Sequence, residues 1–171
     1  MERTAKDELT ITANNTKFTG NINVTNNFTG NQIYGEMWYH NHSATVLNFA
    51  TDGKYYNLTF NDSLTNGFTF SDANDYLLAL VDGTYKACYM ASGSGQNNHA
   101  YFTSIRINNE IQGKCESHKK MSAGGDVMTM NGCCFITLSN GDEVRLSTAD
   151  IGGTGAGEYY SANVNIVRIG T

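Results

Sequence analysis

The chain has 171 residues, a formal net charge of -5, 18 glycines and no proline, and 16% of its residues are charged while 40% are hydrophobic. This length allows one sizeable hydrophobic core, and the low charge argues against a charge-rich disordered chain or a long-helix protein. The acidic balance argues against nucleic acid as a partner, because phosphate binding needs clustered Lys and Arg.

Uncharged polar residues take the place of the missing charge, with 21 Asn and 19 Thr in the chain. Asn, Thr and Gly disfavour helices, whereas Thr, Tyr, Val, Ile and Phe favour strands. Gly and Asn also supply the positive φ angles that tight turns need. The composition therefore predicts an all-β protein with many tight connections.

The first 32 residues differ from the rest in having few large apolar side chains. They contain the repeat Phe18-Thr19-Gly20-Asn21 and Phe28-Thr29-Gly30-Asn31, and apolar residues two apart at Leu9/Ile11 and Ile22/Val24. This spacing is typical of a strand that buries one narrow face, but the segment is too short to make a core alone. We expect either a flexible tail or an extended arm held by a partner chain or a neighbouring copy. The first residues lack the apolar run of a signal peptide, so we expect synthesis in the cytoplasm.

Strand patterns recur at short intervals after residue 32, separated by turn pairs such as Asp52-Gly53, Asn66-Gly67, Asn108-Asn109 and Asn140-Gly141. Eight or more short strands at this spacing predict a sandwich or a barrel. The predicted strands cover residues 33–40, 45–49, 55–60, 68–70, 84–91, 99–108, 110–118, 127–138, 143–148 and 158–169.

Alternation assigns faces in two of these strands. In residues 127–138 the even positions are mostly apolar, while the odd positions carry Thr129, Asn131 and Thr137, so one face is core. In residues 158–169 both faces are apolar, which requires two coverings: the core of the domain and, most economically, a neighbouring subunit around a symmetry axis. The predicted subunit contacts are Tyr159, Val164, Ile166, Val167 and Ile169.

No constellation of reactive residues predicts an enzyme, a metal site or a cofactor. The glycine-rich segment 152–157 lacks the Lys-Ser/Thr of a phosphate loop and is expected to be a long loop between strands. His40 and His42 lie on one side of a possible strand and could bind a transition metal, particularly if three copies met on an axis, and His99 and His118 have no acidic residue at a spacing that suggests a triad. Asp72, Asp75 and Asp82 lack a calcium-loop pattern and are expected to form a solvated acidic rim.

Two further groups of residues have competing interpretations. The cysteines Cys88, Cys115, Cys133 and Cys134 show no Cys-x-x-Cys spacing, and the favoured interpretation is buried free thiols, although pairing stays open. Cys133 and Cys134 are adjacent, so in a strand their side chains point to opposite faces. Aromatic side chains either pack in the core or an interface, or contact a sugar receptor; the candidates for that contact are Trp38, Tyr39 and Tyr55.

Five segments follow one another along the chain: Ala44-Thr45-Val46-Leu47-Asn48-Phe49, Gly67-Phe68-Thr69-Phe70, Gly83-Thr84-Tyr85-Lys86-Ala87, Leu138-Ser139-Asn140-Gly141-Asp142-Glu143-Val144-Arg145-Leu146 and Tyr160-Ser161-Ala162-Asn163-Val164-Asn165-Ile166-Val167-Arg168-Ile169. Their order resembles the complement C1q/tumour-necrosis-factor-like jelly roll. With the opening Tyr34-Gly35-Glu36-Met37 and the segment Ser122-Ala123-Gly124-Gly125-Asp126, the chain resembles more closely the phage virion proteins that carry this domain behind a short N-terminal segment. The resemblance covers about residues 33 to 170 and implies a ten-strand sandwich and a compact homotrimer.

From these observations we expect a non-enzymatic phage virion protein, made in the host cytoplasm and located in the virion, with no nucleic-acid or membrane partner. Residues 1–32 would be an attachment arm and residues 33–171 a homotrimeric jelly roll, in a capsid decoration or head-fibre role. The alternatives are a receptor-binding tail-fibre tip that contacts a host-surface glycan and a carbohydrate-acting enzyme. The arm would bind a major capsid or tail protein by strand pairing, through Leu9, Ile11, Phe18, Ile22, Val24 and Phe28.

Overall fold

The computed structural model describes residues 32–123 and 126–170, with only the backbone of Asn41 and His42. The predicted arm contacts lie outside the described residues: Leu9, Ile11, Phe18, Ile22, Val24 and Phe28. Helix is confined to two short 3-10 turns in the described part, η1 (Asp72–Asn74) and η2 (Gly113–Cys115). None of the described helices has the length and apolarity needed to cross a membrane.

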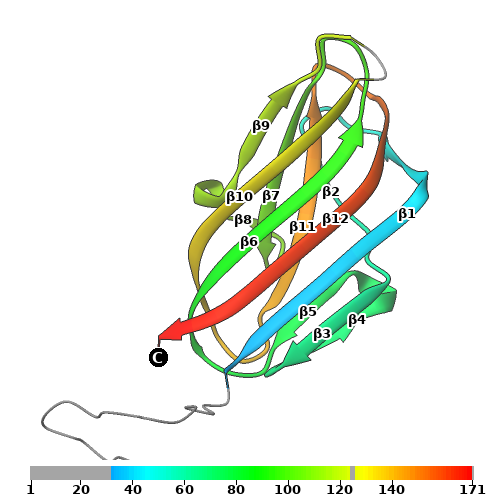
Figure 1. Cartoon of the computed structure of the whole chain (residues 1–171). Helices are drawn as coiled ribbons and strands as arrows, with labels where there is room; N and C mark the ends of the chain where they lie inside the picture. The colour runs from blue at the N-terminus through cyan, green and yellow to red at the C-terminus, as the bar shows by residue number, and fades with distance from the viewer. Residues whose placement is uncertain (1–31, 124–125, 171) are drawn as a thin grey trace, which may run out of the picture. The chain divides into compact units, whose positions relative to one another are not determined.

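Two antiparallel sheets face each other as a sandwich, as the all-β prediction required (Figure 1). The five-stranded sheet has the order β10-β6-β12-β1-β3, and the seven-stranded sheet has the order β4-β5-β11-β7-β8 with β2 and β9 added beside β11 and β7. The five-stranded sheet contains β1 (Tyr34–Phe49), β3 (Asp62–Asn66), β6 (Gly83–Ser94), β10 (Val127–Leu138) and β12 (Gly155–Gly170). The seven-stranded sheet contains β2 (Tyr55–Asn57), β4 (Phe68–Ser71), β5 (Tyr76–Ala79), β7 (Ala100–Ile107), β8 (Glu110–Ile111), β9 (Ser117–Lys120) and β11 (Glu143–Ile151).

The core lies between the sheets and follows the alternation of the strands. Met128, Met130, Ile136 and Leu138 of β10 are all buried, which confirms the predicted core face of that strand. A large cluster fills most of the space between the sheets, and a smaller one around Phe49 fills the rest. Burial of these side chains is the main driving force for folding.

The chain crosses from one sheet to the other at the predicted Asn66-Gly67 turn, between β3 and β4. Gly67 has a φ of +79°, a left-handed conformation that glycine adopts without steric cost. Asn108 and Asn109 both have positive φ, at 50° and 72°, and connect β7 to β8. The turn residues predicted from the sequence therefore occupy the backbone conformations that their types favour.

Several predicted boundaries were wrong. The described residues form twelve strands rather than ten, because β3 and β5 were not predicted and residues 110–118 are divided by η2 into β8 and the start of β9. Conversely, β1 runs through two predicted strands, with an irregularity in register between His40 and Thr45. The expected long glycine-rich loop is only residues 152–154, since Gly155 already begins β12.

Candidate functional site

The outward surface of the five-stranded sheet, called the outer face below, carries a regular array of side chains from neighbouring strands. Glu36 of β1 lies opposite Leu64 of β3 and Asn165 of β12, and Asn165 lies opposite Cys88 of β6. Glu36, Asn165 and Cys88 point away from the core, because side chains alternate along a strand and the residues that flank them are buried, and Leu64 is 55% exposed. Two parallel rows are Asn66, Tyr34, Val167, Lys86 and Phe135, and Asp62, Trp38, Asn163, Met90 and Asn131.

Exposed apolar side chains concentrate on the strands of this sheet. Of the nine large hydrophobic residues that are exposed in the described part, six belong to the five-stranded sheet, and Phe135 is 60% exposed. Such a concentration marks an interaction surface more often than single exposed apolar residues do. The six residues are Val46, Leu64, Met90, Val127, Phe135 and Ile169.

Three of the five predicted subunit contacts lie inside the domain, so their placement at an interface was wrong. Val164 and Ile166 are fully buried between the sheets, and Tyr159 is 5% exposed, where its ring packs on Tyr39. An irregularity in register between residues 159 and 161 explains Tyr159, because an extra residue reverses the alternation. Val167 is half-buried and Ile169 is exposed, and these two remain available to a partner.

The structure does not bring together the three aromatic residues predicted to contact a sugar receptor. Tyr39 is 8% exposed, and its hydroxyl lies 2.5 Å from Thr45 Oγ1, so its prediction as a surface contact was wrong. Trp38 lies on the outer face, whereas Tyr55 belongs to β2 of the other sheet. A single sugar-stacking platform therefore cannot include all three residues.

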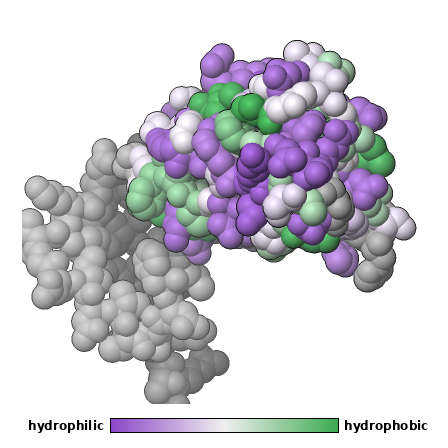
Figure 2. Space-filling model, turned by 90° about the horizontal axis from the view of Figure 1, so that it is seen from above, coloured by the Kyte–Doolittle hydropathy of each residue, from purple (hydrophilic) through white to green (hydrophobic). Residues whose placement is uncertain are grey.

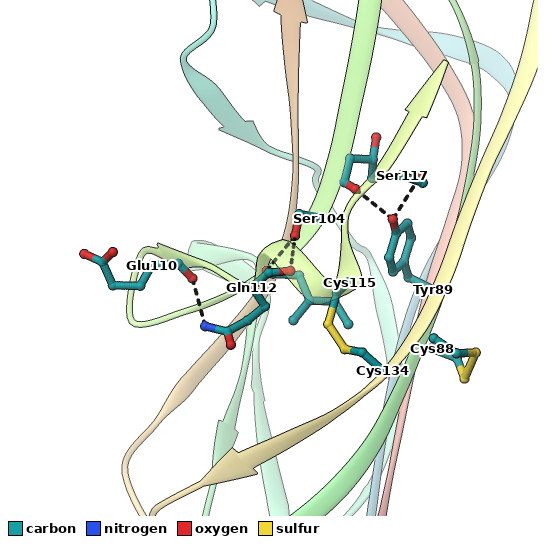
Figure 3. The surroundings of a disulfide bond; sticks show 11 residues. Cys88, Tyr89, Ser104, Glu110, Gln112, Cys115, Ser117 and Cys134 are labelled. Atoms are coloured by element: carbon teal, nitrogen blue, oxygen red, sulfur yellow. Dashed lines mark hydrogen bonds between the residues drawn. A yellow bond between two sulfur atoms is a disulfide. The ribbon is translucent and has the colours of Figure 1, made fainter.

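All four cysteines form disulfides, so the favoured interpretation as free thiols was wrong. Cys133 and Cys134 do point to opposite sides of β10, and each finds a different partner. Cys133 bonds Cys88 of the adjacent strand on the outer face, with 4.1 Å between the Cα atoms. Cys134 bonds Cys115 of η2 on the inner side, with 5.3 Å between the Cα atoms (Figure 3). The Cys115–Cys134 disulfide links the five-stranded sheet to the segment between β8 and β9.

The surroundings of Cys115 are also held by hydrogen bonds (Figure 3). The Tyr89 hydroxyl donates to the Thr103 carbonyl oxygen at 2.7 Å and lies 2.9 Å from Ser117 Oγ. The Ser104 hydroxyl lies 3.1 Å from the Gln112 carbonyl oxygen. Burial raises the pKa of the Tyr89 hydroxyl above its usual value. The disulfide therefore lies beside hydrogen bonds that connect β6, β7 and β9.

His99 and His118 each have an acidic partner in the fold, although neither has one at a sequence spacing that suggests a triad. His99 Nδ1 lies 2.8 Å from Oδ2 of Asp150, whose side chain is fully buried, and His118 Nε2 lies 2.6 Å from Glu116 Oε1. The sequence separation of 51 residues hides the first pair, because β7 and β11 become neighbours only in the folded sheet. No hydroxyl or thiol nucleophile is hydrogen-bonded to either ring among the described residues, so these pairs fasten loops and strands.

Tyr55 joins the second pair on the seven-stranded sheet. Its hydroxyl donates to Glu116 Oε2, and the His118 ring stacks on Phe102 with 3.8 Å between the ring centroids. Burial, followed by the hydrogen bond to Glu116, raises the pKa of Tyr55 well above its usual value. Because the Tyr55 hydroxyl and the His118 ring both contact the Glu116 carboxylate, the cluster links β2 to β9.

Two of the carboxylates considered as calcium ligands accept hydrogen bonds from backbone amides of loops instead. Asp75 Oδ1 accepts a hydrogen bond from the Phe60 amide at 2.9 Å, and Asp82 Oδ1 accepts one from the Asn140 amide at 2.6 Å. No cluster of three or more His, Cys, Asp or Glu side chains suited to a metal ion occurs in residues 32–123 and 126–170. On the face seen from above, hydrophilic residues cover much of the coloured surface and hydrophobic residues form separate patches (Figure 2).

Sequence reasoning missed most residues of the outer face, including Leu64, Met90 and Phe135. One signal was present: Phe135 is a large apolar residue at an odd position of β10, where the other odd positions are mostly polar. Leu64 lies in a polar segment that was not predicted to be a strand, so its direction could not be assigned.

Known structures resemble the fold of this chain. A TNF named Eiger from S. frugiperda superposes with a TM-score of 0.56 at 9% identity, covering 82% of this chain and 94% of that one. The globular domain of zebrafish complement 1qA protein gives 0.50 at 16% identity (81% and 97% covered), and murine APRIL gives 0.57 at 8% identity (81% and 99% covered). No protein-family model and no curated protein sequence matches the chain. The described domain therefore has the C1q/TNF-like jelly-roll fold.

Proposed function

We propose that this chain is a non-enzymatic structural protein of a virus particle, displayed as a homotrimer whose jelly rolls pack through the outer face and whose first 32 residues attach it to the particle. The observation that carries the proposal is the concentration of exposed apolar side chains on one sheet. Of the nine large hydrophobic residues that are exposed in the described part, six belong to the five-stranded sheet. Burial of these side chains against other copies would remove them from water, and each buried apolar Å² contributes about 25 cal/mol.

The disulfides support a location outside a reducing cytoplasm. Cys88–Cys133 and Cys115–Cys134 pair all four cysteines, and disulfides persist in oxidising surroundings, which include the surface of a virion. A particle protein made in the cytoplasm would form these bonds after release. Secreted domains share this property, so the disulfides support display in the extracellular medium and the resemblance to phage virion proteins supports the particle.

Light scattering on the full-length protein tests the trimer. The wild type should be a trimer at micromolar concentration, and Phe135→Asp should dissociate it because a carboxylate would be buried in an apolar contact. Ile111→Asp is the matched control, since Ile111 is 42% exposed on the seven-stranded sheet and should leave the trimer intact. A monomeric wild type, or a Phe135→Asp variant that stays trimeric, would contradict the proposed face.

A binding experiment with particles tests the arm. Protein that lacks residues 1–30 should remain a soluble trimer and should no longer bind particles that lack this protein, whereas the full-length chain should bind them. Particles that retain the truncated protein would refute the attachment role. Binding of the isolated trimer to host cells would instead favour a receptor-binding tip.

A further inference from the structure

Two opposite charges stand out on the outer face. Within the rows that contain Tyr34, Glu36 and Trp38, the strands β1, β12, β6 and β10 carry only two charged side chains, Glu36 on β1 and Lys86 on β6. The strand β12 lies between them, and the two residues are also offset by two positions along the strands, so their backbones are about 12 Å apart. These rows of β1, β12, β6 and β10 therefore present one negative and one positive group, separated by the polar and apolar side chains of β12, while the carboxylates of Asp62 on β3 and Glu158 on β12 lie elsewhere on the outer face.

Neither group forms an ion pair with another residue of the described part. The ion pairs of the described residues are His99–Asp150, His118–Glu116 and Arg145–Glu143, and none includes Glu36 or Lys86. Lys86 is exposed, and it lies between Val167 and Phe135 in its row. An ammonium group in such apolar surroundings would need a carboxylate if another molecule covered the face.

The Glu36 carboxylate is held in position by two side-chain amides. Asn163 Nδ2 donates to Glu36 Oε1 at 2.8 Å, and Asn165 Nδ2 donates to Asn163 Oδ1 at 2.5 Å. These bonds connect β1 to β12 and fix the side chain of Glu36 before any partner arrives. A preorganised carboxylate loses less conformational entropy on binding than a freely rotating one.

We propose that Lys86 of one copy pairs with Glu36 of the next copy, and that this ion pair sets the direction in which the copies pack. The inference rests on the proposed trimer and adds the contact that orders it. The partner on this face is a second copy of the chain, because a face with charges of both signs is complementary to itself. This holds although the whole chain carries a net charge of -5. In a closed ring each copy would offer Lys86 to one neighbour and Glu36 to the other. Opposite charges across an interface fix its register and exclude wrong orientations.

A charge swap in the full-length chain tests the pair. Lys86→Glu or Glu36→Lys alone should weaken association by at least about tenfold, because each variant places like charges together at every interface. The double variant that carries both changes should recover most of the lost affinity, since every interface regains an opposite pair. Analytical ultracentrifugation gives the association constants, and Lys114→Glu, at an exposed position of η2, is the matched control.

The outcomes separate the ion pair from the trimer itself. A monomeric wild type would overturn the proposed function, whereas single reversals that associate as tightly as the wild type would overturn only the pair. Failure of the double variant to recover, while it unfolds in urea like the wild type, would also overturn it. Salt dependence is a second test: raising the ionic strength should weaken association of the wild type relative to Lys86→Glu, because salt screens the attraction of the pair in the wild type and the repulsion of like charges in the variant. The same salt dependence in both proteins would refute the pair.

Discussion

Asp75 combines a left-handed backbone with a partly buried carboxylate. Its φ is 56°, and its Oδ1 atom accepts the Phe60 amide hydrogen at 2.9 Å. Burial raises the pKa of this carboxyl above its usual value of 3.8, so the folded state favours the protonated form. Asparagine keeps an acceptor oxygen at the same place, tolerates the left-handed backbone and carries no charge.

We predict that Asp75→Asn is at least as stable as the wild type at neutral pH. A group whose pKa is raised on folding contributes stability below its unfolded pKa and loses it as the pH rises through the folded pKa. The advantage of the variant should therefore grow as the pH rises from 3 towards neutrality. Urea unfolding at several pH values measures this difference, and Asp75→Ala, which lacks the acceptor, should be less stable than both. An advantage that shrinks with pH would contradict the assignment.

Gly67 is required by the backbone and by a close contact. Its φ is +79°, and a Cβ atom there would lie 2.7 Å from Ile33 Cγ2. Gly67→Ala should destabilise the domain by about 1–2 kcal/mol from the left-handed backbone alone, and by more if Ile33 cannot move. Gly113 has no atom within 4 Å of such a Cβ, so Gly113→Ala is the control and should leave the urea midpoint nearly unchanged. Equal midpoints for the two variants would refute this explanation.

The strands of the sandwich differ in how far their sequences predict them. The bounds of β10 match the prediction, because twelve residues of alternating hydrophobicity define both an extent and a face. β3 has the sequence Asp-Ser-Leu-Thr-Asn, whose polar residues favour turns, and it becomes a strand only because it pairs with β1. Tertiary pairing overrides local preference there.

The disulfides could not be predicted for a related reason. Adjacent cysteines predicted two directions, but the partners lie 45 and 19 residues away in the sequence, and only the register of β6 with β10 and the position of η2 bring them together. The outer face could not be predicted for the same reason, since its rows cross strands that are distant in the chain. The alternation of side chains within a strand could be predicted from the sequence, whereas the order of the strands in the sheets could not.

These two disulfides should contribute differently to stability. The denatured loop closed by Cys88–Cys133 is longer than the loop closed by Cys115–Cys134, so in the chain-entropy model the bonds are worth about 4 and about 3 kcal/mol. We predict that Cys88→Ala with Cys133→Ala lowers the free energy of unfolding by more than Cys115→Ala with Cys134→Ala. Urea unfolding of each double variant measures the loss. The opposite order would show that the buried position of Cys115, which is 2% exposed, outweighs loop length.

Across the whole molecule, buried tyrosines take the place of some of the aliphatic residues that a core usually contains. Tyr85, Tyr89, Tyr101 and Tyr159 are each at most 5% exposed, and burial raises the pKa of all four hydroxyls. Each hydroxyl has a hydrogen-bond partner from a loop or a neighbouring strand. The tyrosines therefore tie the two sheets and their loops together while the hydroxyls stay protonated.

This arrangement predicts a loss of stability at alkaline pH. Unfolded tyrosine ionises near pH 10, whereas the buried hydroxyls keep their protons to higher pH, so the unfolded state binds fewer protons above pH 10. The contribution of these tyrosines to the free energy of unfolding is therefore fully present below pH 10. It falls as the pH rises towards the folded pKa values, by up to about 1.4 kcal/mol per pH unit for each tyrosine. Urea unfolding between about pH 8 and pH 11 measures the slope, with mass spectrometry to verify that the disulfides are unchanged. Tyr89→Phe should reduce the slope by one tyrosine's share, and a wild-type free energy of unfolding that stays constant over this range would show that the buried hydroxyls do not control the alkaline limit.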